Sequence, residues 1–310
     1  MANTDNSLIK EKIEMKKSRE LLEGFIDMHI HAGPSLMARE IDAWDMALSA
    51  SAAGYRAVVI KDHHIPSVAA ARIINSHLPH PETRVFGSIA MNSSVGGLNP
   101  KALEAAIGFG AAVVWMPTVS SRNHAVKHSG HGLKFPGTTH AATVPEPEYV
   151  ITDDAGRLIP DAYTILEIMA RHENVALATG HGSRDEVDAV IRAAAEMGIS
   201  RIVATHPHYM VDATDDDLLA WSSLNAFIEL NAVISVPDSK FFCIPLQRVI
   251  DIIHNVGPEH IIISSDYGQK GNGNPVEGME TFIAILLENG IGEDAIRMMG
   301  HDNPSYLLGI

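Results

Sequence analysis

Residues 25–31 read FIDMHIH and combine the apolar pattern of a β-strand with three side chains that can bind a metal ion. Asp27, His29 and His31 are spaced two residues apart, so in a regular strand all three point to one face. Burying a carboxylate and two imidazoles on that face is costly without a partner. We therefore interpret the segment as part of a metal site, which requires further ligands elsewhere in the chain.

Other polar residues stand where strand-like runs end. Ionisable or metal-binding residues end six of the eight runs described below, whereas the third and fourth end in MN and WMPT. Such clustering favours a common site over isolated packing roles. These further candidates are Lys61, His63, His64, His181, His206, His208, Glu229, Asn231 and Asp266.

The residue types indicate which metal would bind. Neutral imidazoles with one carboxylate suit Zn, Mn, Fe(II) or Co better than Ca or Mg, which prefer oxygen ligands. Cys243 is the only cysteine, which excludes a thiolate zinc cluster and an intrachain disulfide. A metal ion lowers the pKa of a water that it binds to about 7. Asp266 could ligate the ion, accept a proton from that water, or do both.

The spacing of apolar runs predicts an α/β fold. Nearly continuous Val, Ile and Ala runs are typical of parallel strands that are buried on both faces. Eight strand and helix pairs indicate a (β/α)8 TIM barrel, and no GxGxxG sequence supports a doubly wound open sheet instead. The strands are expected at 25–31, 56–61, 84–91, 111–118, 175–181, 201–206, 226–231 and 261–266. The helices are expected at 40–54, after Pro66, after Pro100, and at 160–172, 183–197, 215–224, 241–256 and 277–289.

We divide the chain into a helical N-terminal extension, residues 1–23, and a single barrel domain, residues 24–310. Leu8, Ile9, Ile13, Leu21 and Leu22 could form an apolar stripe that packs on the barrel or on another subunit; a solvated helix is the alternative.

A long insertion, about 117–159, interrupts the repeat after the fourth strand. Insertions of this length in a compact domain are usually functional or disordered. We expect a hairpin that turns at 154–156, and we consider 119–145 a candidate lid. Arg122 and the histidines 124, 128 and 131 are weaker site candidates.

Composition narrows the classes of partner. The chain has 310 residues, 46% hydrophobic and 20% charged, with a formal net charge of −15 and a pI near 5.5. This charge disfavours nucleic-acid binding, so we expect a small-molecule substrate. No apolar stretch has the length of a signal peptide or membrane span, which favours a cytoplasmic protein that does not bind membranes. A homo-oligomer is possible through the N-terminal helix or the segment around Phe241, Phe242 and Cys243.

The order of several motifs resembles the amidohydrolase superfamily of metal-dependent hydrolases. These motifs are DMHIH on the first strand, ATGH on the fifth, VATHPH on the sixth, SSDYG on the eighth, and the closing NPSYLLGI. KDHH, VGGLNP and WMPT further suggest a poorly characterised branch. The resemblance implies that His29 and His31 are metal ligands, that His181 and His206 are ligands or line the metal pocket, and that Asp266 is both a ligand and the proton acceptor.

One departure from the superfamily pattern leaves the metal count at one or two ions. Many members with two metal ions carry a bridging carbamylated lysine or glutamate at the end of the fourth strand, where this chain reads VVWMPT. Lys61 or the insertion would have to supply a bridge instead.

Three functional hypotheses follow. The first is a hydrolase in which metal-activated water attacks a small amide, lactone or ester, with Asp266, Lys61 and His206 as catalytic residues. The second is a decarboxylase of a small unsaturated acid with one metal ion, and the third is a binding barrel without catalysis. For the substrate we expect contacts from His63, Trp115, Thr118, Arg122 and His208.

Overall fold

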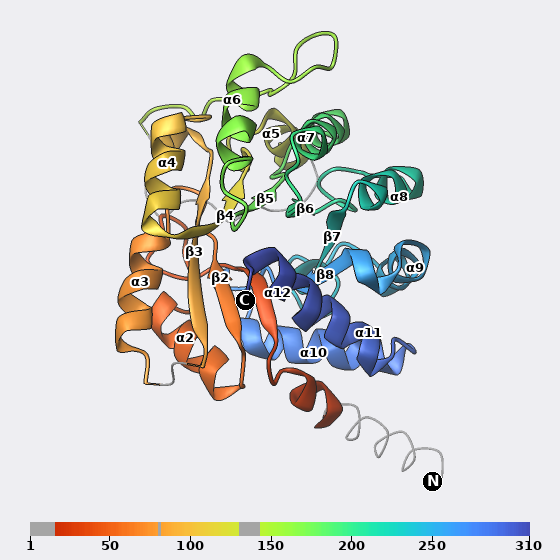
Figure 1. Ribbon diagram of the computed structural model, residues 1–310. Helices are drawn as coiled ribbons and strands as arrows, with labels where there is room; N and C mark the ends of the chain where they lie inside the picture. The colour runs from red at the N-terminus through yellow and green to blue at the C-terminus, as the bar shows by residue number, and fades with distance from the viewer. Residues whose placement is uncertain (1–15, 80–81, 130–142) are drawn as a thin grey trace, which may run out of the picture.

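The computed structural model of the protein describes residues 16–79, 82–129 and 143–310. Within these residues, eight parallel strands form one sheet in chain order, and helices surround it (Figure 1). The strands are β1 (Ile26–Ile30), β2 (Ala57–Ile60), β3 (Arg84–Ala90), β4 (Ala111–Trp115), β5 (Ala176–Ala178), β6 (Ile202–Ala204), β7 (Ala226–Asn231) and β8 (Ile261–Ser264). The predicted (β/α)8 barrel is confirmed.

The helices follow the strands in the expected alternation, and two of them, α7 and α8, begin with a complete capping box. At the start of α7, the Ser183 side chain accepts from the Glu186 amide, and the Glu186 side chain accepts from the Ser183 amide. The helices are α2 (Ala43–Ala52), α3 (Val68–His77), α4 (Pro100–Phe109), α5 (Arg122–His128), α6 (Pro160–Met169), α7 (Arg184–Glu196), α8 (Asp215–Ser223), α9 (Leu246–Val256), α10 (Pro275–Glu288), α11 (Glu293–Arg297) and α12 (Asn303–Leu308).

Two backbone hydrogen bonds close the barrel between β1 and the chain just after β8. The Asp266 amide donates to the His29 carbonyl over 2.8 Å, and the His31 amide donates to the Tyr267 carbonyl over 2.8 Å. Gly268 permits this approach, because a Cβ there would lie 1.6 Å from the carbonyl oxygen of His31. The seam of the barrel therefore brings the histidines of β1 next to Asp266.

A bulge in β1 changes the expected orientation of Asp27. The pairing of β1 with β2 matches Asp27 to Val58 and Ile30 to Ile60, so β1 contains one extra residue between the two pairs. Regular alternation is lost there, and the prediction that Asp27 shares one face with both histidines is wrong. Its carboxylate instead accepts from the backbone amides of His29, at 3.1 Å, and Ser265.

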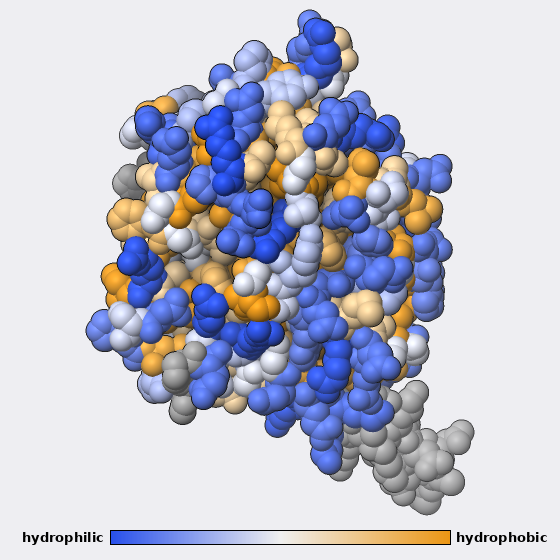
Figure 2. Space-filling model, viewed as in Figure 1, coloured by the Kyte–Doolittle hydropathy of each residue, from blue (hydrophilic) through white to orange (hydrophobic). Residues whose placement is uncertain are grey.

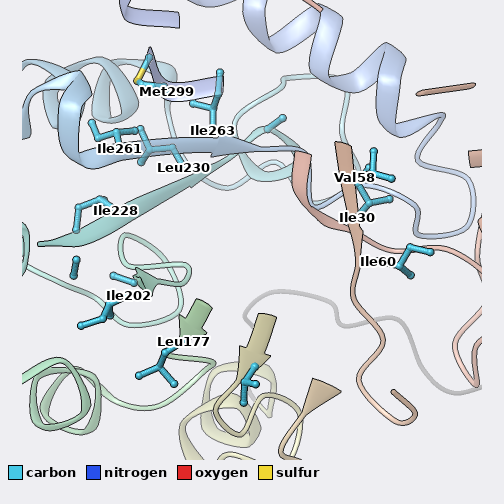
Figure 3. Close-up of a cluster of buried hydrophobic side chains, with 14 of the residues drawn as sticks. Ile30, Val58, Ile60, Leu177, Ile202, Ile228, Leu230, Ile261, Ile263 and Met299 are labelled. Carbon is cyan, nitrogen blue, oxygen red and sulfur yellow. The ribbon is translucent and has the colours of Figure 1, made fainter. Parts of the chain in front are cut away.

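The core has two layers on either side of the strands. Outward-facing aliphatic residues of the strands pack against the helices, as Figure 3 shows for Ile261 and Ile263 near Met299. A second cluster fills the inside of the barrel with Ala, Val and Ile side chains, and includes Trp115. Leu307 and Leu308, at the end of α12, belong to this inner cluster. The last helix thus covers one end of the barrel interior.

One expectation about the helices is corrected. The helix expected at 241–256 begins at Leu246, because Pro245 disfavours helical backbone in the residue before it. In the insertion, part of the proposed lid is the short helix α5, and 130–142 lie outside the described residues. The expected hairpin is present as one antiparallel bridge between Thr152 and Leu158.

The described end of the N-terminal extension packs on the barrel. Residues 16–21 are helical, and Leu21 and Leu22 are each only 1% exposed. The Arg19 guanidinium reaches Glu280 of α10 at 3.1 Å. Leu8, Ile9 and Ile13 lie outside the described residues.

The surface is mixed in character. The face in Figure 2 is mostly hydrophilic, with apolar side chains in separate patches. Among the helices of the described residues, none has the length and hydropathy needed to cross a bilayer.

Candidate metal centre

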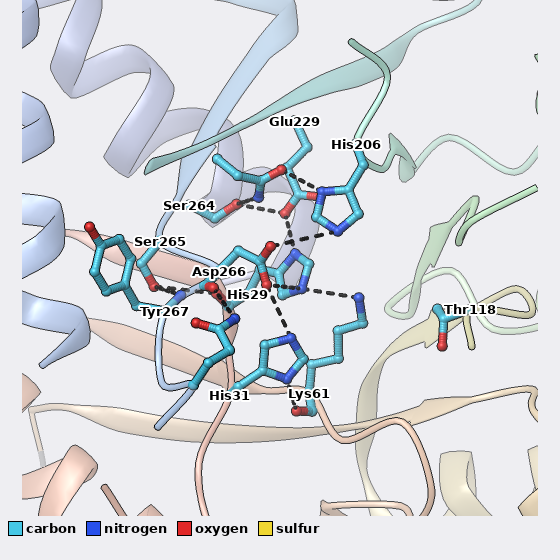
Figure 4. A network of polar contacts seen from close by, with 12 residues as sticks. His29, His31, Lys61, Thr118, His206, Glu229, Ser264, Ser265, Asp266 and Tyr267 are labelled. Atoms are coloured by element: carbon cyan, nitrogen blue, oxygen red, sulfur yellow. Dashed lines mark hydrogen bonds and ion pairs between the residues drawn. The ribbon is translucent and has the colours of Figure 1, made fainter. Parts of the chain in front are cut away.

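His29, His31 and Asp266 form a buried group whose ligand atoms lie within 4.8 Å of one another. Both Nε2 atoms face the same carboxylate oxygen, Asp266 Oδ1, at 3.1 Å from His29 and 3.0 Å from His31 (Figure 4). The bulge in β1 and the seam with β8 create this convergence. Two imidazoles and a carboxylate are a donor set that suits zinc and related transition metals.

Hydrogen bonds behind the ligands orient both rings. His31 Nδ1 lies 2.9 Å from the carbonyl oxygen of Lys61, which can only accept, so Nδ1 carries the proton. His31 Nε2 therefore directs a lone pair at Asp266, which is itself an acceptor. Two facing acceptors are unfavourable unless a cation lies between them. The arrangement fits a metal ion, and backing groups of this kind are common around metal-binding histidines.

The charge around His29 leads to the same conclusion. Its Nδ1 lies 2.9 Å from Glu229, so each ring nitrogen faces a carboxylate. Burial and the charge of Lys61 lower the pKa of His29, but Asp266 and Glu229 outweigh both and raise it. The excess negative charge that favours a proton on His29 would equally favour a metal ion.

The neighbouring groups have the protonation states that metal binding requires. Burial lowers the pKa of His31 to about 3 and that of His206 to about 3, so both rings are neutral. Burial opposes ionisation of Asp266, but the charge of His29 and the hydrogen bond from its Nε2 hold the pKa of Asp266 well below the usual range. His31 and Asp266 can therefore coordinate without losing a proton, whereas His29 would exchange its proton for the ion.

His206 and His181, also predicted as ligands, border the group. His206 Nδ1 is 2.7 Å from Asn231 Oδ1, and its Nε2 lies 3.8 Å from Asp266 Oδ2. His181 Nδ1 lies 2.8 Å from His124 Nδ1, and its buried Nε2 has no hydrogen-bond partner. Each ring thus has one nitrogen fixed and one turned toward the cavity described below.

Backbone strain coincides with the site. Asp266 and His206 have positive φ angles of 51° and 49°. Residues other than glycine adopt this left-handed region at a cost of about 1–3 kcal/mol. Both of these stand at the carboxyl ends of strands, where a barrel of this class carries its chemistry. The strain turns the two side chains toward the barrel axis.

Lys61 is fully buried beside the ligands. Its Nζ lies 3.0 Å from His29 Nε2 and 4.2 Å from the centre of the Trp115 ring. Burial lowers its pKa to about 8, although the charges of Asp266 and Glu229 oppose that fall. Lys61 is therefore not an ordinary solvated lysine at a strand end, since its exposure is 0%.

A small cavity of about 50 Å³ opens onto the cluster. Its polar wall includes Lys61, His181, His206 and Asp266, and its apolar wall includes Phe241. The other lining residues are His31, Met37, Arg39, His63, His128, Tyr209, Met210, Val233, Ile234 and Gln269.

Of the five residues predicted to contact substrate, all within the described chain, His63 lines the cavity and the others do not. Trp115 packs against His29, with ring centroids 4.7 Å apart, inside the barrel. Thr118 is buried with its hydroxyl 2.9 Å from His63 Nδ1, and His208 is also buried. The Arg122 side chain is 60% exposed, 3.8 Å from Glu148, because α5 directs it outward.

Sequence reasoning missed Arg39 and placed His124 only among the weaker candidates. Arg39 lines the cavity, but it lies in an irregular segment where no strand or helix pattern directs attention to it. His124 was rated weak as a loop residue, yet it is only 5% exposed and bonds to His181. Its place in the sequence HAVKH, with His128 one helical turn later, was the available signal. His131 lies outside the described residues.

The fold and the site define a parallel (β/α)8 barrel with a buried His-His-Asp group at the carboxyl ends of its strands. The profile of a family of unknown function, DUF6282, matches residues 24–229, and the chain belongs to that family. No curated protein sequence matches the chain.

Solved structures resemble this chain over nearly its whole length. A probable dipeptidase, PvdM, from Pseudomonas aeruginosa has a TM-score of 0.64 at 13% identity and covers 96% of this chain and 98% of its own. An amidohydrolase from Pseudomonas aeruginosa has a TM-score of 0.62 at 13% identity, with 94% and 98% covered. The 2,6-dihydroxybenzoate decarboxylase from Rhizobium has a TM-score of 0.50 at 12% identity, with 93% and 99% covered. The resemblance to the amidohydrolase superfamily is therefore confirmed for the fold.

Proposed function

We propose that the protein is a metal-dependent enzyme that hydrolyses a small amide, lactone or ester. The observation that carries this proposal is that the imidazoles of His29 and His31 both face the buried carboxylate of Asp266. A divalent cation held there would polarise a carbonyl and lower the pKa of a coordinated water to about 7. The two imidazoles and one carboxylate favour zinc. The hydrolases among the structures of similar fold support the same class.

The residues of the site would have separate roles in binding the cation, accepting a proton and stabilising the oxyanion. His29, His31 and Asp266 would hold the cation, with His181 and His206 as further ligands or as neighbours. Asp266 has a second oxygen, Oδ2, which faces His206 and can accept the proton of the attacking water. Lys61 would stabilise the oxyanion that develops at the carbonyl, since it lines the cavity. His206 is neutral and its Nδ1 donates to Asn231 Oδ1, so its Nε2 offers a lone pair to a cation and no proton to an oxyanion.

The cavity favours a compact substrate. Its volume of about 50 Å³ is far below the roughly 300 Å³ or more of pockets for drug-sized ligands. Phe241, Val233 and Ile234 give it an apolar side opposite the polar residues. We therefore expect a molecule with one hydrolysable polar bond and a short hydrocarbon part.

Decarboxylation is the second candidate, and the end of β4 favours it. The chain after β4 reads MPT, and no described residue there can bridge two cations. A site with one metal ion beside the cationic groups Lys61 and Arg39 could hold and cleave a carboxylate substrate. The decarboxylase among the similar folds is consistent with this alternative.

Metal analysis and product analysis test these proposals together. The purified protein is analysed for bound metal, stripped with a chelator, and assayed on a panel of small amides, lactones, esters and unsaturated acids. We expect activity that is lost on stripping and restored by zinc, manganese or cobalt.

Heavy-oxygen water separates the two reactions. Label that appears in the product supports hydrolysis, and release of carbon dioxide supports decarboxylation. Full activity after exhaustive stripping would refute both, whereas metal binding without any turnover would favour the binding barrel.

A further inference from the structure

We propose that Arg39 binds a carboxylate of the substrate, so that the molecule hydrolysed is a small acid whose carboxylate does not react. This inference rests on the proposed function and names its substrate class. Arg39 lines the cavity together with His31, Lys61 and Asp266. Its side chain is only 4% exposed.

The Arg39 guanidinium lacks the partners that a buried cation needs. Its Nε is buried and has no hydrogen-bond partner. Its Nη2 lies 3.9 Å from Asp62 Oδ2, beyond hydrogen-bond distance, and 3.7 Å from the sulfur of Met37. A guanidinium in such a position is costly unless an anion satisfies it. Arg39 therefore keeps donors available on the cavity side.

Asp62 fills this role only in part, because the protein holds its Oδ1, while its Oδ2 is buried without a hydrogen-bond partner 3.9 Å from Arg39 Nη2. Asp62 Oδ1 accepts from the amide of His64 at 2.8 Å and from the amide of Ile65 at 3.1 Å. These bonds anchor the carboxylate to the loop after β2. Asp62 supplies a nearby negative charge without forming hydrogen bonds to the Arg39 guanidinium. The paired N–H groups of that guanidinium match the two oxygens of a substrate carboxylate in both shape and charge.

Gln269 completes the subsite with an unpaired acceptor. Arg39 and Gln269 are partners in an isolated antiparallel bridge, so they are neighbours where both line the cavity. Gln269 Nε2 donates to the Asp266 carbonyl over 2.6 Å, while its buried Oε1 has no partner. A donor and an acceptor side by side suit a carboxylate with an N–H or O–H group on the adjacent carbon.

The charge of the cavity supports an acidic ligand. The chain as a whole carries a formal net charge of −15, yet Arg39 and Lys61 both place cationic groups in this one small cavity. A divalent cation in the His-His-Asp group would add to that positive charge. An anion would therefore gain from both the cavity charge and the direct bonds to Arg39.

A matched pair of probes tests the proposal. N-acetylglycine and N-acetylglycinamide differ only in a carboxylate against a carboxamide, and both carry an N–H on the adjacent carbon. Binding of each to the zinc-loaded protein is measured by calorimetry. We expect the acid to bind at least about tenfold more tightly, the usual scale of one buried charge-assisted hydrogen bond.

Four variants locate the effect. Arg39→Gln should remove the preference for the acid, and Arg39→Lys should restore part of it. Gln269→Glu should also remove it, because a fixed negative charge beside Arg39 competes with the ligand. The control, Arg84→Gln, makes the same change in net charge at the exposed start of β3 and should keep the preference. Circular dichroism verifies that each variant is folded.

The outcomes separate this inference from the proposed function. Equal affinity for the two probes, no binding of the acid to the wild-type protein, or a preference that survives Arg39→Gln would overturn the carboxylate subsite. Hydrolysis of neutral substrates as fast as acids would also overturn it and leave the proposed function intact. Arg39-dependent binding of the acid without any turnover would preserve the subsite and count against hydrolysis.

Discussion

Two buried polar regions lie at the carboxyl ends of the strands, and they differ in how completely their atoms are paired. The first, the Asn92 network, comprises Asn92, Thr118, Ser120 and the carbonyl of His63. Asn92 Nδ2 donates to the His63 carbonyl and to Thr118 Oγ1, over 2.8 and 2.7 Å. Its Oδ1 accepts from the amides of Thr118 and Ser120, at 2.7 and 3.2 Å. Its amide group is fully satisfied within the protein.

The second region, around the cavity, has several buried polar atoms without partners. They include the Nε2 of His181, the Nε of Arg39 and the Oε1 of Gln269. Buried polar groups are normally paired, so such exceptions require an explanation. The comparison assigns a structural role to the Asn92 network, which joins the ends of β2, β3 and β4, and a ligand-binding role to the cavity.

The largest expected effect is on turnover, from Asp266→Asn. The change removes a metal-ligand charge and the proton acceptor, so we expect the rate to fall by about a thousandfold or more. A smaller fall in the unfolding free energy should accompany it, because the depressed pKa of Asp266 means that its charge, paired with His29, stabilises the folded protein. The rate is measured on the best substrate of the panel, with unfolding followed in urea. Asp154→Asn, in an exposed turn, is the matched control, and near-full activity of Asp266→Asn would contradict the site.

Asn92→Ala should reverse this pattern. It removes four hydrogen bonds and leaves buried partners unpaired, which we expect to cost about 2–4 kcal/mol of unfolding free energy. Metal affinity of the folded protein should change far less than stability, because Asn92 bonds to none of His29, His31 and Asp266 and, within the described residues, reaches the cavity only through Thr118 and His63. Urea unfolding and metal titration measure the two effects. Asn174→Ala is the matched control, because Asn174 is exposed. A loss of metal affinity without a loss of stability in Asn92→Ala would contradict the structural role of the Asn92 network.

Glu229→Gln should weaken metal binding by about 10- to 100-fold, the usual effect of changing a group that orients a metal-binding histidine. Glu229 Oε1 accepts from Ser264 at 2.6 Å and bonds to His29 at 2.9 Å. Its charge is retained because His29 and these bonds overcome burial and lower its pKa to about 2. Glutamine keeps the shape and removes the charge. Chelator competition measures the affinity, and an unchanged value would remove Glu229 from the site.

Asp27 gives an effect that appears only as a dependence of stability on pH, and it lies between the two classes, since it is hydrogen-bonded and yet fully buried as an acid. Burial outweighs its bonds to Ser265 and His29 and raises its pKa to about 7, above the unfolded value near 3.8. The folded state therefore holds this proton more tightly, and its contribution to stability falls as the pH rises from about 4 to 7. Relative to Asp27→Asn, the slope should reach up to about 1.4 kcal/mol per pH unit.

Urea unfolding of both proteins at a series of pH values measures this slope. Above the folded pKa, near 7, the difference between the two proteins should become constant. A difference that is flat from pH 4 to 7, or that rises with pH, would show that Asp27 is ionised throughout this range.

Much of the architecture followed from local patterns. Runs such as RAVVIK and IIISSD combine continuous apolar residues with a polar end, and they were placed correctly as strands with their last residues at the site. The start of α9 was misplaced, because the apolar segment before Pro245 resembles a helix turn by composition alone. Phe241 lies there and lines the cavity, a contact that depends on folding and not on periodicity.

The site shows the same division. The spacing of His29 and His31 predicts them as ligands, and the structure brings both to Asp266, but their regular alternation with Asp27 is broken by the bulge. Arg39 carried no signal at all, because an arginine in an irregular segment is normally solvated. Only the pairing of its backbone with Gln269 turned that side chain inward.

The sequence by itself determined the eight-unit barrel and the chemistry of its strand ends, because apolar periodicity and residue type are local properties. The tertiary structure decided which of those polar groups meet and which find partners within the protein. These contacts depend on the barrel seam between His29 and Asp266, whose residue numbers differ by 237. Distances across such a seam are set by the closure of the whole sheet, which no short segment specifies.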